Sequence, residues 1–260
     1  MADSVVVSGT RILGVLQVTL NRPECLNAFD QEMAGKLAEA FETIRYDLST
    51  RAVILTGAGR GFCAGGDVRA MQDSGDPGKY ILELSRLLHQ AMKAMVHMPQ
   101  PVICAVNGPA AGGGLGLALA ADIRIAGSSA RFSTGHVRLG ISPDGGPTFF
   151  LPRLIGDTWA AAMMMAGYVL GAREAFDRGL VIDVVPDESL VHAAEEIAGR
   201  VVRYPRIPVA QTKALLRKSW ERSMDAQLEE ERTGLAISGE SPKFREGIAA
   251  FIEKRDPDFR

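Results

Sequence analysis

The first half of the chain alternates short apolar runs with longer amphipathic stretches. Residues 15–20 alternate apolar and polar positions, and residues 52–56 and 102–106 are almost continuously apolar, which is typical of strands. Between these runs, apolar residues recur every three or four positions over residues 33–48 and 81–95, a spacing that predicts two helices with a buried face each. Strands alternating with helices predict an α/β fold.

The last third of the chain has a different pattern. Strand-like runs become rare after about residue 180, and residues 188–203, 209–222 and 244–254 predict helices separated by prolines. We therefore expect a helical C-terminal part, with a soft boundary near residue 200.

Composition and charge exclude several classes of protein. Apolar residues make up 47% of the chain and charged residues 23%, which is enough core-forming material to exclude a disordered protein. The net charge of -2 gives no basic field, so nucleic acid is not expected as a partner. The longest stretch of low charge, residues 99–121, is broken by prolines and glycines, so no membrane span is expected.

The three cysteines do not form a recognisable pair or cluster. Cys25, Cys63 and Cys104 are far apart, odd in number and outside any CxxC or paired-histidine spacing. This pattern favours a reduced, metal-free protein of the cytoplasm.

The strand at residues 52–56 runs into a glycine-rich turn, GAGRGFCAGGD, over residues 57–67. A dinucleotide-binding fingerprint would need glycine at positions 57, 59 and 62, but position 62 is Phe62. The chain also lacks the phosphate-loop and serine-hydrolase motifs.

A second glycine-rich turn, NGPAAGGGLGLALAAD over residues 107–122, leads into a stretch that predicts a buried helix. The unpaired N–H groups at the start of such a helix would stabilise negative charge on an oxygen, as in an oxyanion hole. Alternatively, Gly112, Gly113 and Gly114 serve only close packing. Spacing alone does not choose between the two interpretations.

Five segments, taken together and in order, resemble the crotonase family, also called the enoyl-CoA hydratase/isomerase family. They are NRPECLNAFD (21–30), FCAGGDV (62–68), NGPAAGGGLGLALAADIRIA (107–126), LGISPDGGPTFFLPRLIG (139–156) and AFIEKRDPDF (250–259). The resemblance implies a crotonase-like spiral of repeated strand-strand-helix units over residues 1–200 and a helical trimerisation region over residues 201–260. It also implies an acyl-CoA substrate, with coenzyme A as part of that substrate and no tightly bound cofactor, and a homo-oligomer, either a trimer or a dimer of trimers.

The resemblance also assigns binding residues. It implies that the backbone N–H groups of Gly66 and Gly113 hold the thioester oxygen and stabilise an enolate, by roughly 3 to 4 kcal/mol each. It further implies a wall for the adenine and pantetheine of CoA, and two residues that reach the nucleotide of a neighbouring subunit. The wall comprises Glu24, Cys25, Ala64, Asp67 and Val68, together with Gly66 and Gly113, and the two reaching residues are Phe251 and Lys254.

The acid-base positions depart from the hydratases of this family. Those enzymes use two glutamates, and the matching positions here hold Gly116 and His136. Asp144, in SPDGG, resembles the single acid-base carboxylate of several family isomerases. Its apolar neighbours suggest a buried side chain. The alternative to a catalytic role is that Asp144 only caps a helix that follows Pro143.

The leading hypothesis is an enzyme that shifts the double bond of an enoyl-CoA, with Asp144 as acid-base group. Hydration, or hydrolysis of a thioester or a β-diketone, by His136 with Asp144 is an alternative, and a non-catalytic acyl-CoA binder is another. The remaining histidines, His89, His97 and His192, are interpreted as surface or packing residues on helices.

Overall fold

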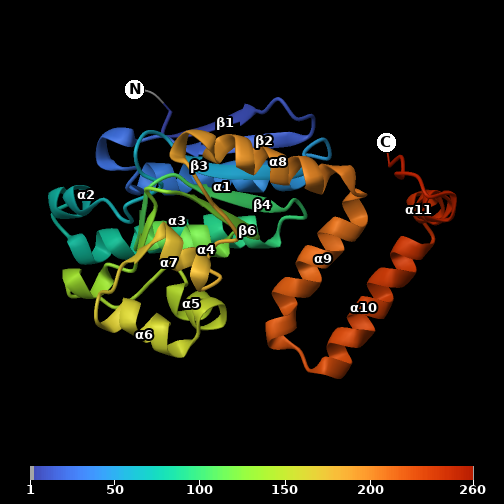
Figure 1. Ribbon diagram of the computed structural model, residues 1–260. Coiled ribbons are helices and arrows are strands. Elements are labelled where there is room, and N and C mark those ends of the chain that lie inside the picture. Colours follow the sequence, from blue (N-terminus) through green and yellow to red (C-terminus); the bar gives the residue numbers. More distant parts are fainter. Residues whose placement is uncertain (1–2, 260) are drawn as a thin grey trace.

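The computed structural model describes residues 3–259 and contains two sheets (Figure 1). The larger sheet has six strands, in which the first two neighbours are antiparallel and all other neighbours are parallel. In sheet order these strands are β1 (Val5–Gly9), β2 (Val15–Leu20), β3 (Ala52–Gly57), β4 (Val102–Val106), β6 (Ile123–Gly127) and β9 (Val184–Val185). The smaller sheet consists of β5 (Pro109–Ala111), β7 (Arg131–Ser133) and β8 (Leu170–Gly171).

The chain moves repeatedly from the larger sheet to the smaller one and then into a helix. Strand β4 belongs to the larger sheet, β5 to the smaller one, and a buried helix follows; β6 and β7 repeat the step. This is the strand-strand-helix repeat that the resemblance implies.

The helices cover both faces of the larger sheet and extend beyond it (Figure 1). The helices before the C-terminal part are α1 (Gln31–Tyr46), α2 (Val68–Asp73), α3 (Pro77–His97), α4 (Gly113–Ala120), α5 (Pro147–Ile155), α6 (Asp157–Met165), α7 (Ala172–Asp177) and α8 (Leu190–Arg203). The C-terminal part consists of α9 (Arg206–Lys218), α10 (Met224–Gly239) and α11 (Pro242–Glu253). Short 3-10 turns are η1 (Pro23–Cys25), η2 (His136–Leu139), η3 (Asp187–Ser189) and η4 (Ser219–Glu221).

The central strands read as continuous apolar runs because both of their faces are covered. In β3, Val53 and Leu55 belong to the core that contains α1 and α3, whereas Ala52 and Ile54 belong to the core under α8. All four side chains are fully buried. Burial on both faces removes the polar alternation that a half-exposed strand would show.

Most predicted elements are confirmed, with three differences at the helices. The helix predicted over residues 209–222 is α9, which runs from Arg206 to Lys218 and is followed by the 3-10 turn η4. The first helix ends at Tyr46, and Leu48, which was expected to continue its stripe, lies beyond the end and is 74% exposed. Helix α10 was not predicted, because none of its residues is buried and its sequence therefore carries no apolar stripe. The boundary near residue 200 remains a prediction. Within residues 3–259, no helix is both long enough and apolar enough to cross a membrane.

Candidate active site

The two glycine-rich turns lie side by side. Cys63 forms a parallel bridge with Ala110, and the N–H of Ala111 donates to the carbonyl of Cys63 at 2.9 Å. A Cβ placed on Gly65 would stand 3.6 Å from the Cα of Gly112. Segments far apart in the sequence are therefore brought together at the start of α4.

Gly66 and Gly113 each present a backbone N–H that has no acceptor. Within residues 3–259, neither amide donates a hydrogen bond, and both glycines are partly accessible. Gly113 is the first residue of α4, where N–H groups have no partner inside the helix and the helix dipole is positive. The pair of amides is thus suited to stabilising negative charge on an oxygen.

The glycine triplet combines close packing with an unbonded amide, and the oxyanion-hole interpretation stays a prediction. A Cβ on Gly114 would clash with the carbonyl of Cys63, so this glycine permits close packing. A Cβ on Gly113 would stand 2.7 Å from Cδ2 of Leu88, and its N–H is free. Close packing and a free amide therefore occur at neighbouring positions of the same triplet.

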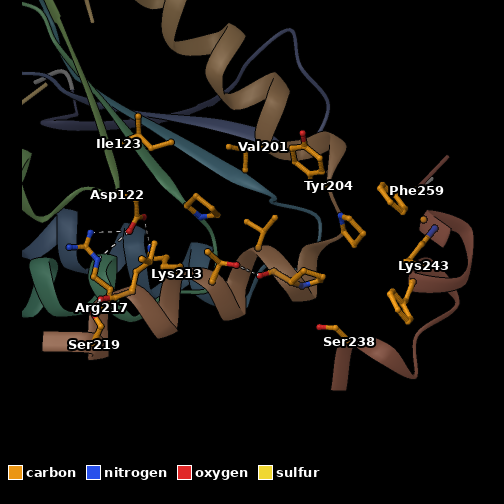
Figure 2. Close-up of a pocket in the computed structure, with 18 of the residues that line it drawn as sticks. Asp122, Ile123, Val201, Tyr204, Lys213, Arg217, Ser219, Ser238, Lys243 and Phe259 are labelled. Atoms are coloured by element: carbon orange, nitrogen blue, oxygen red, sulfur yellow. Dashed lines mark hydrogen bonds and ion pairs between the residues drawn. The ribbon is translucent and has the colours of Figure 1, made fainter. Parts of the chain in front are cut away.

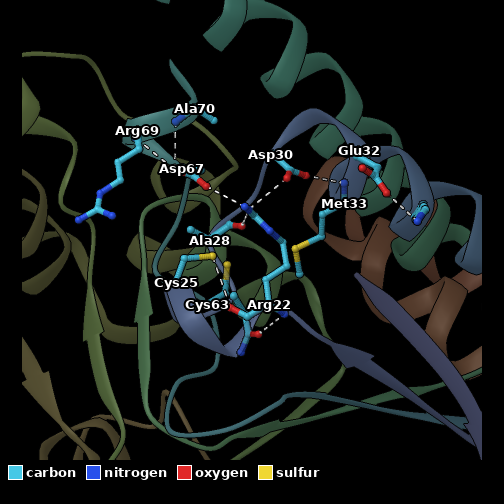
Figure 3. A network of polar contacts seen from close by, with 12 residues as sticks. Arg22, Cys25, Ala28, Asp30, Glu32, Met33, Cys63, Asp67, Arg69 and Ala70 are labelled. Carbon is cyan, nitrogen blue, oxygen red and sulfur yellow. Dashed lines mark hydrogen bonds and ion pairs between the residues drawn. The ribbon is translucent and has the colours of Figure 1, made fainter. Parts of the chain in front are cut away.

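The guanidinium of Arg22 joins the segment before α1 to the last residue of the first turn (Figure 3). Arg22 donates to the carbonyl of Ala28 at 2.6 Å and to the carboxylate of Asp67 at 2.9 Å, and it lies 3.3 Å from Asp30. Asp30 caps α1 by accepting from the N–H of Met33. Arg22 therefore connects the start of α1 to the residue that follows Gly66.

Asp67 is used to hold this turn. Its carboxylate accepts from the N–H groups of Arg69 and Ala70 and so caps α2. Burial acts to raise the pKa of Asp67, but the hydrogen bonds from Ala70 and Arg22 outweigh it and hold that pKa below its ordinary value. The N–H of Asp67 also donates to the carbonyl of Phe29. The side chain that the resemblance places in the CoA wall is thus occupied by contacts within the protein.

Asp144 lies in the loop between η2 and α5, and two expectations about it are wrong. Its side chain is 42% exposed instead of buried. It does not cap α5, because that helix begins at Pro147 after Gly146 and has no side-chain cap. The Oδ1 atom of Asp144 instead lies 2.9 Å from Nε2 of His89, on α3.

His136 contacts the backbone of Asp144, not its carboxylate. Its Nε2 accepts from the N–H of Asp144 at 3.3 Å. The ring is buried, and its Nδ1 has no partner within residues 3–259. Burial lowers the pKa of His136, and the nearby charge of Asp144 opposes this only in part. A neutral ring keeps the lone pair that accepts from the Asp144 N–H.

Asp144 and His89 face a cavity of about 810 Å³ between α3, the loop at residues 143–146, the start of α5 and α9. Three aromatic side chains also line it, and their ring centroids are 5.2 to 6.3 Å apart; they are Phe149, Phe150 and Trp220. A Cβ on Gly145, also in the lining, would stand 3.3 Å from the Cα of Gly113. The loop that carries the carboxylate thus packs against the glycine that carries a free amide.

Comparison with known proteins gives the family. A family model described as enoyl-CoA hydratase/isomerase matches residues 11–260. The chain is 39% identical to the 1,2-epoxyphenylacetyl-CoA isomerase of Escherichia coli and 34% identical to its 2,3-dehydroadipyl-CoA hydratase, each match covering 95% of both chains. The chain belongs to the enoyl-CoA hydratase/isomerase family. A crystal structure of a putative enoyl-CoA hydratase/isomerase from Mycobacterium abscessus superposes with a TM-score of 0.93 at 34% identity, covering 98% of this chain and 99% of that one, and the crotonase-like fold is thereby confirmed.

Within this family, the absence of a glutamate at position 116 has a structural reason. A Cβ on Gly116 would clash with the carbonyl oxygen of Gly145. Any side chain at this position would therefore displace the loop that holds Asp144. The Asp144 loop can approach α4 this closely only because position 116 is a glycine.

The other residues assigned to CoA fall into two groups. Glu24 and Cys25 lie in η1, next to the first turn, where the N–H of Ala64 donates to the carbonyl of Leu26. Val68 begins α2 and is 49% exposed.

Phe251 and Lys254 form the second group. Phe251 lies on α11 and Lys254 at its C-terminal end, and both are exposed. Figure 1 shows α11 at the opposite end of the view from α2, so a single chain does not bring these two residues to the glycine turns.

Two residues of the site were missed from the sequence. His89 was interpreted only as a surface or packing residue; its side chain is 44% exposed, but its ring also hydrogen-bonds the carboxylate of Asp144. Arg22 received no role, although it lies in the NRPECLNAFD segment that carries part of the resemblance. Both act through contacts more than forty residues away in the sequence, which no local pattern reveals.

Proposed function

We propose that the protein is an isomerase that moves the double bond of an enoyl-CoA. The observation that carries this proposal is the packing of Gly145, the residue after Asp144, against Gly113, which places the loop that carries one carboxylate beside one of the two unpaired amides. An isomerase needs one group that removes a proton and returns it, together with stabilisation of an enolate between the two steps.

The reaction follows from these groups. The Asp144 carboxylate removes a proton from the carbon between the thioester carbonyl and the double bond, and the electron pair of that C–H bond moves into the conjugated system. The N–H groups of Gly66 and Gly113 donate to the thioester oxygen, where the negative charge accumulates. The protonated Asp144 then returns the proton to the far end of the dienolate. No water is added or lost.

The names of the relatives leave the reaction open, whereas the geometry of the site supports isomerisation. One E. coli relative is named an isomerase and another a hydratase, so the names alone do not select a reaction. The site favours isomerisation, because a side chain at position 116 would clash with Gly145 and because His136 is bonded to backbone.

The test is incubation of the purified protein with a 3-enoyl-CoA, following the absorbance of the conjugated thioester and the mass of the product. We expect the 2-enoyl product at unchanged mass, and we expect Asp144→Asn to lower turnover by at least about 100-fold while the thioester still binds. Glu221→Gln is the matched control, because it also removes the charge of a carboxylate that lines the cavity but leaves Asp144 in place.

Other outcomes would select the alternatives. A product heavier by one water would indicate hydration, and release of free CoA would indicate thioester hydrolysis. Cleavage of a β-diketone would indicate the carbon-carbon hydrolase. Saturable binding without turnover on any of these substrates would indicate an acyl-CoA binder. Unchanged turnover in Asp144→Asn would rule out the proposed mechanism.

We propose coenzyme A as part of the substrate, with no tightly bound cofactor. We also propose that the protein assembles into trimers or dimers of trimers. A groove of about 960 Å³ lies between the end of the larger sheet and the C-terminal helices (Figure 2). Its lining includes Phe251. Lys213 and Arg217, on α9, point toward Asp122 in this groove (Figure 2), and each forms an ion pair with it at 2.9 Å. Sedimentation would measure the assembly, and a monomer at micromolar concentration would contradict it.

A further inference from the structure

The carboxylate of Asp144 has a single hydrogen-bond partner among residues 3–259, and that partner is His89. The side chains are 42% and 44% exposed, so their contact is open to the cavity. The loop around Asp144 has no regular secondary structure, and Gly145 and Gly146, which follow it, have φ values of 76° and 83°. The backbone alone therefore does little to fix where the carboxylate points.

Helix α3 contacts both the glycines with unbonded amides and the carboxylate of Asp144. The side chains that make these contacts are close together in the sequence of the helix. These contacts are Leu84 at 3.3 Å and Leu88 at 2.7 Å from the Cβ positions that Gly66 and Gly113 lack, and His89 at 2.9 Å from Asp144. Leu84 and Leu88 are buried, and α3 packs along α1. A rigid helix therefore sets the distance between the amides and the partner of the carboxylate.

The direction of the hydrogen bond follows from the chemistry of the two groups. An ionised carboxylate can only accept, so Nε2 of His89 carries the hydrogen and donates to Oδ1. The second oxygen, Oδ2, has no partner within residues 3–259 and is free to take a proton from a substrate. A neutral donor is sufficient for this role.

Building on the isomerase function proposed above, we propose that His89 is a positioning residue: by donating from Nε2 to Oδ1 of Asp144, it holds Oδ2 at a fixed place relative to the amides of Gly66 and Gly113. His89 itself neither gives nor receives the proton of the reaction. Its contribution is the orientation of the group that does.

The experiment compares His89→Leu with His89→Gln. Leucine fills similar space without a donor, whereas the side-chain amide of glutamine can place an N–H near the position of Nε2. We expect His89→Leu to lower kcat by about 10- to 100-fold with KM little changed, because misplacement of a reacting group by a fraction of an ångström slows the chemical step. His89→Gln should recover most of the loss. In the background of Asp144→Asn, His89→Leu should cause no further loss, because the group it orients is already inactive.

The control is His192→Leu, because His192 also lies near a carboxylate, that of Glu196 at 3.5 Å, but on α8. It should leave kcat unchanged. The proposal is overturned if His89→Leu retains full kcat, if glutamine restores nothing although both variants are folded, or if the loss persists in the Asp144→Asn background. If Asp144→Asn itself is fully active, the isomerase mechanism fails, which distinguishes that failure from one at His89 alone.

Discussion

The amide pair of Gly66 and Gly113 and the carboxylate of Asp144 lie in adjoining parts of the site, but different contacts hold them. The amides belong to turns joined by backbone hydrogen bonds and a strand bridge, and side chains at either glycine would meet α2 or α3. The carboxylate extends from a loop, is 42% exposed, and depends on the side chains of His89 and His136.

The two parts of the site therefore constrain the sequence differently. The amide half, formed by Gly66 and Gly113, is built from backbone, so only the backbone conformation and the lack of a Cβ matter there. The acid-base half is built from side chains, which can be exchanged without disturbing the turns. Gly116 couples the halves, because it belongs to α4 and its missing side chain leaves room for Gly145. In the proposed mechanism, proton transfer therefore depends on the loop, and enolate stabilisation depends on the turns.

Among the changes that test this difference, the largest loss of kcat should come from adding one methyl group at a glycine of the amide pair. In Gly113→Ala, the new Cβ would stand 2.7 Å from Cδ2 of Leu88 and would push the amide from its place. We expect kcat to fall by about 100-fold, in line with the loss of one oxyanion donor. Turnover of the 3-enoyl-CoA measures it.

Two matched variants separate this effect from damage to the fold. Gly35→Ala also adds a methyl group to a helix, but its Cβ meets nothing within 4 Å, so turnover should stay unchanged. Adding Leu88→Val to Gly113→Ala removes Cδ2 and should restore part of the activity. Full activity of Gly113→Ala alone would show that this amide is not needed.

A smaller effect should follow from loosening the same half without touching its glycines. Arg22→Met keeps an apolar stem but removes the hydrogen bonds to Asp67 and Ala28. We expect the free energy of unfolding to fall by about 1.5 to 3 kcal/mol, as for hydrogen bonds to charged groups, and kcat to fall by about 10-fold. Chemical denaturation and steady-state kinetics measure the two quantities.

The control for Arg22 is Arg86→Met, which removes an exposed ion pair with Glu83 on α3. Such a pair contributes about 0 to 1 kcal/mol, and its loss should leave kcat unchanged. If Arg22→Met lowers stability but not kcat, the guanidinium supports the fold and not the position of the Gly66 amide.

The sequence predicted the amide half better than the acid-base half, for a physical reason. Turns made of glycine leave a local signal, because the CAGGD and GGG runs are visible without any knowledge of contacts. The strands at residues 52–56 and 102–106 were equally visible, because burial on both faces gives a continuous apolar run.

Long-range side-chain contacts left no such signal. The distance between His89 and Asp144 depends on how α3 packs, and 55 residues separate the two in the chain. The expected burial of Asp144 was wrong because apolar neighbours in sequence do not exclude an open cavity in space. Helix α10 was missed because it buries no residue, so periodicity could not report it.

The smallest expected effect is on the free energy of unfolding and concerns His136, which supports the Asp144 loop. It is seen as a change in the pH dependence of stability. Burial lowers the pKa of His136 in the folded protein below its ordinary value of 6.5, although the charge of Asp144 acts in the opposite direction. Between the folded and unfolded pKa values the unfolded state binds more protons, so the contribution of His136 to stability is present above pH 6.5. It is lost as the pH falls toward the folded pKa, by at most about 1.4 kcal/mol per pH unit.

His136→Gln isolates this contribution, because its side-chain oxygen can still accept from the N–H of Asp144 but does not titrate. We expect it to flatten the fall in unfolding free energy below about pH 6.5, whereas His97→Gln, at an exposed position that ends α3, should keep the slope of the parent protein. Denaturation at a series of pH values measures both. If His136→Gln and the parent have the same slope, the ring accepts a proton as easily in the folded protein as in the unfolded chain, and the bond from Asp144 N–H does not require a neutral imidazole.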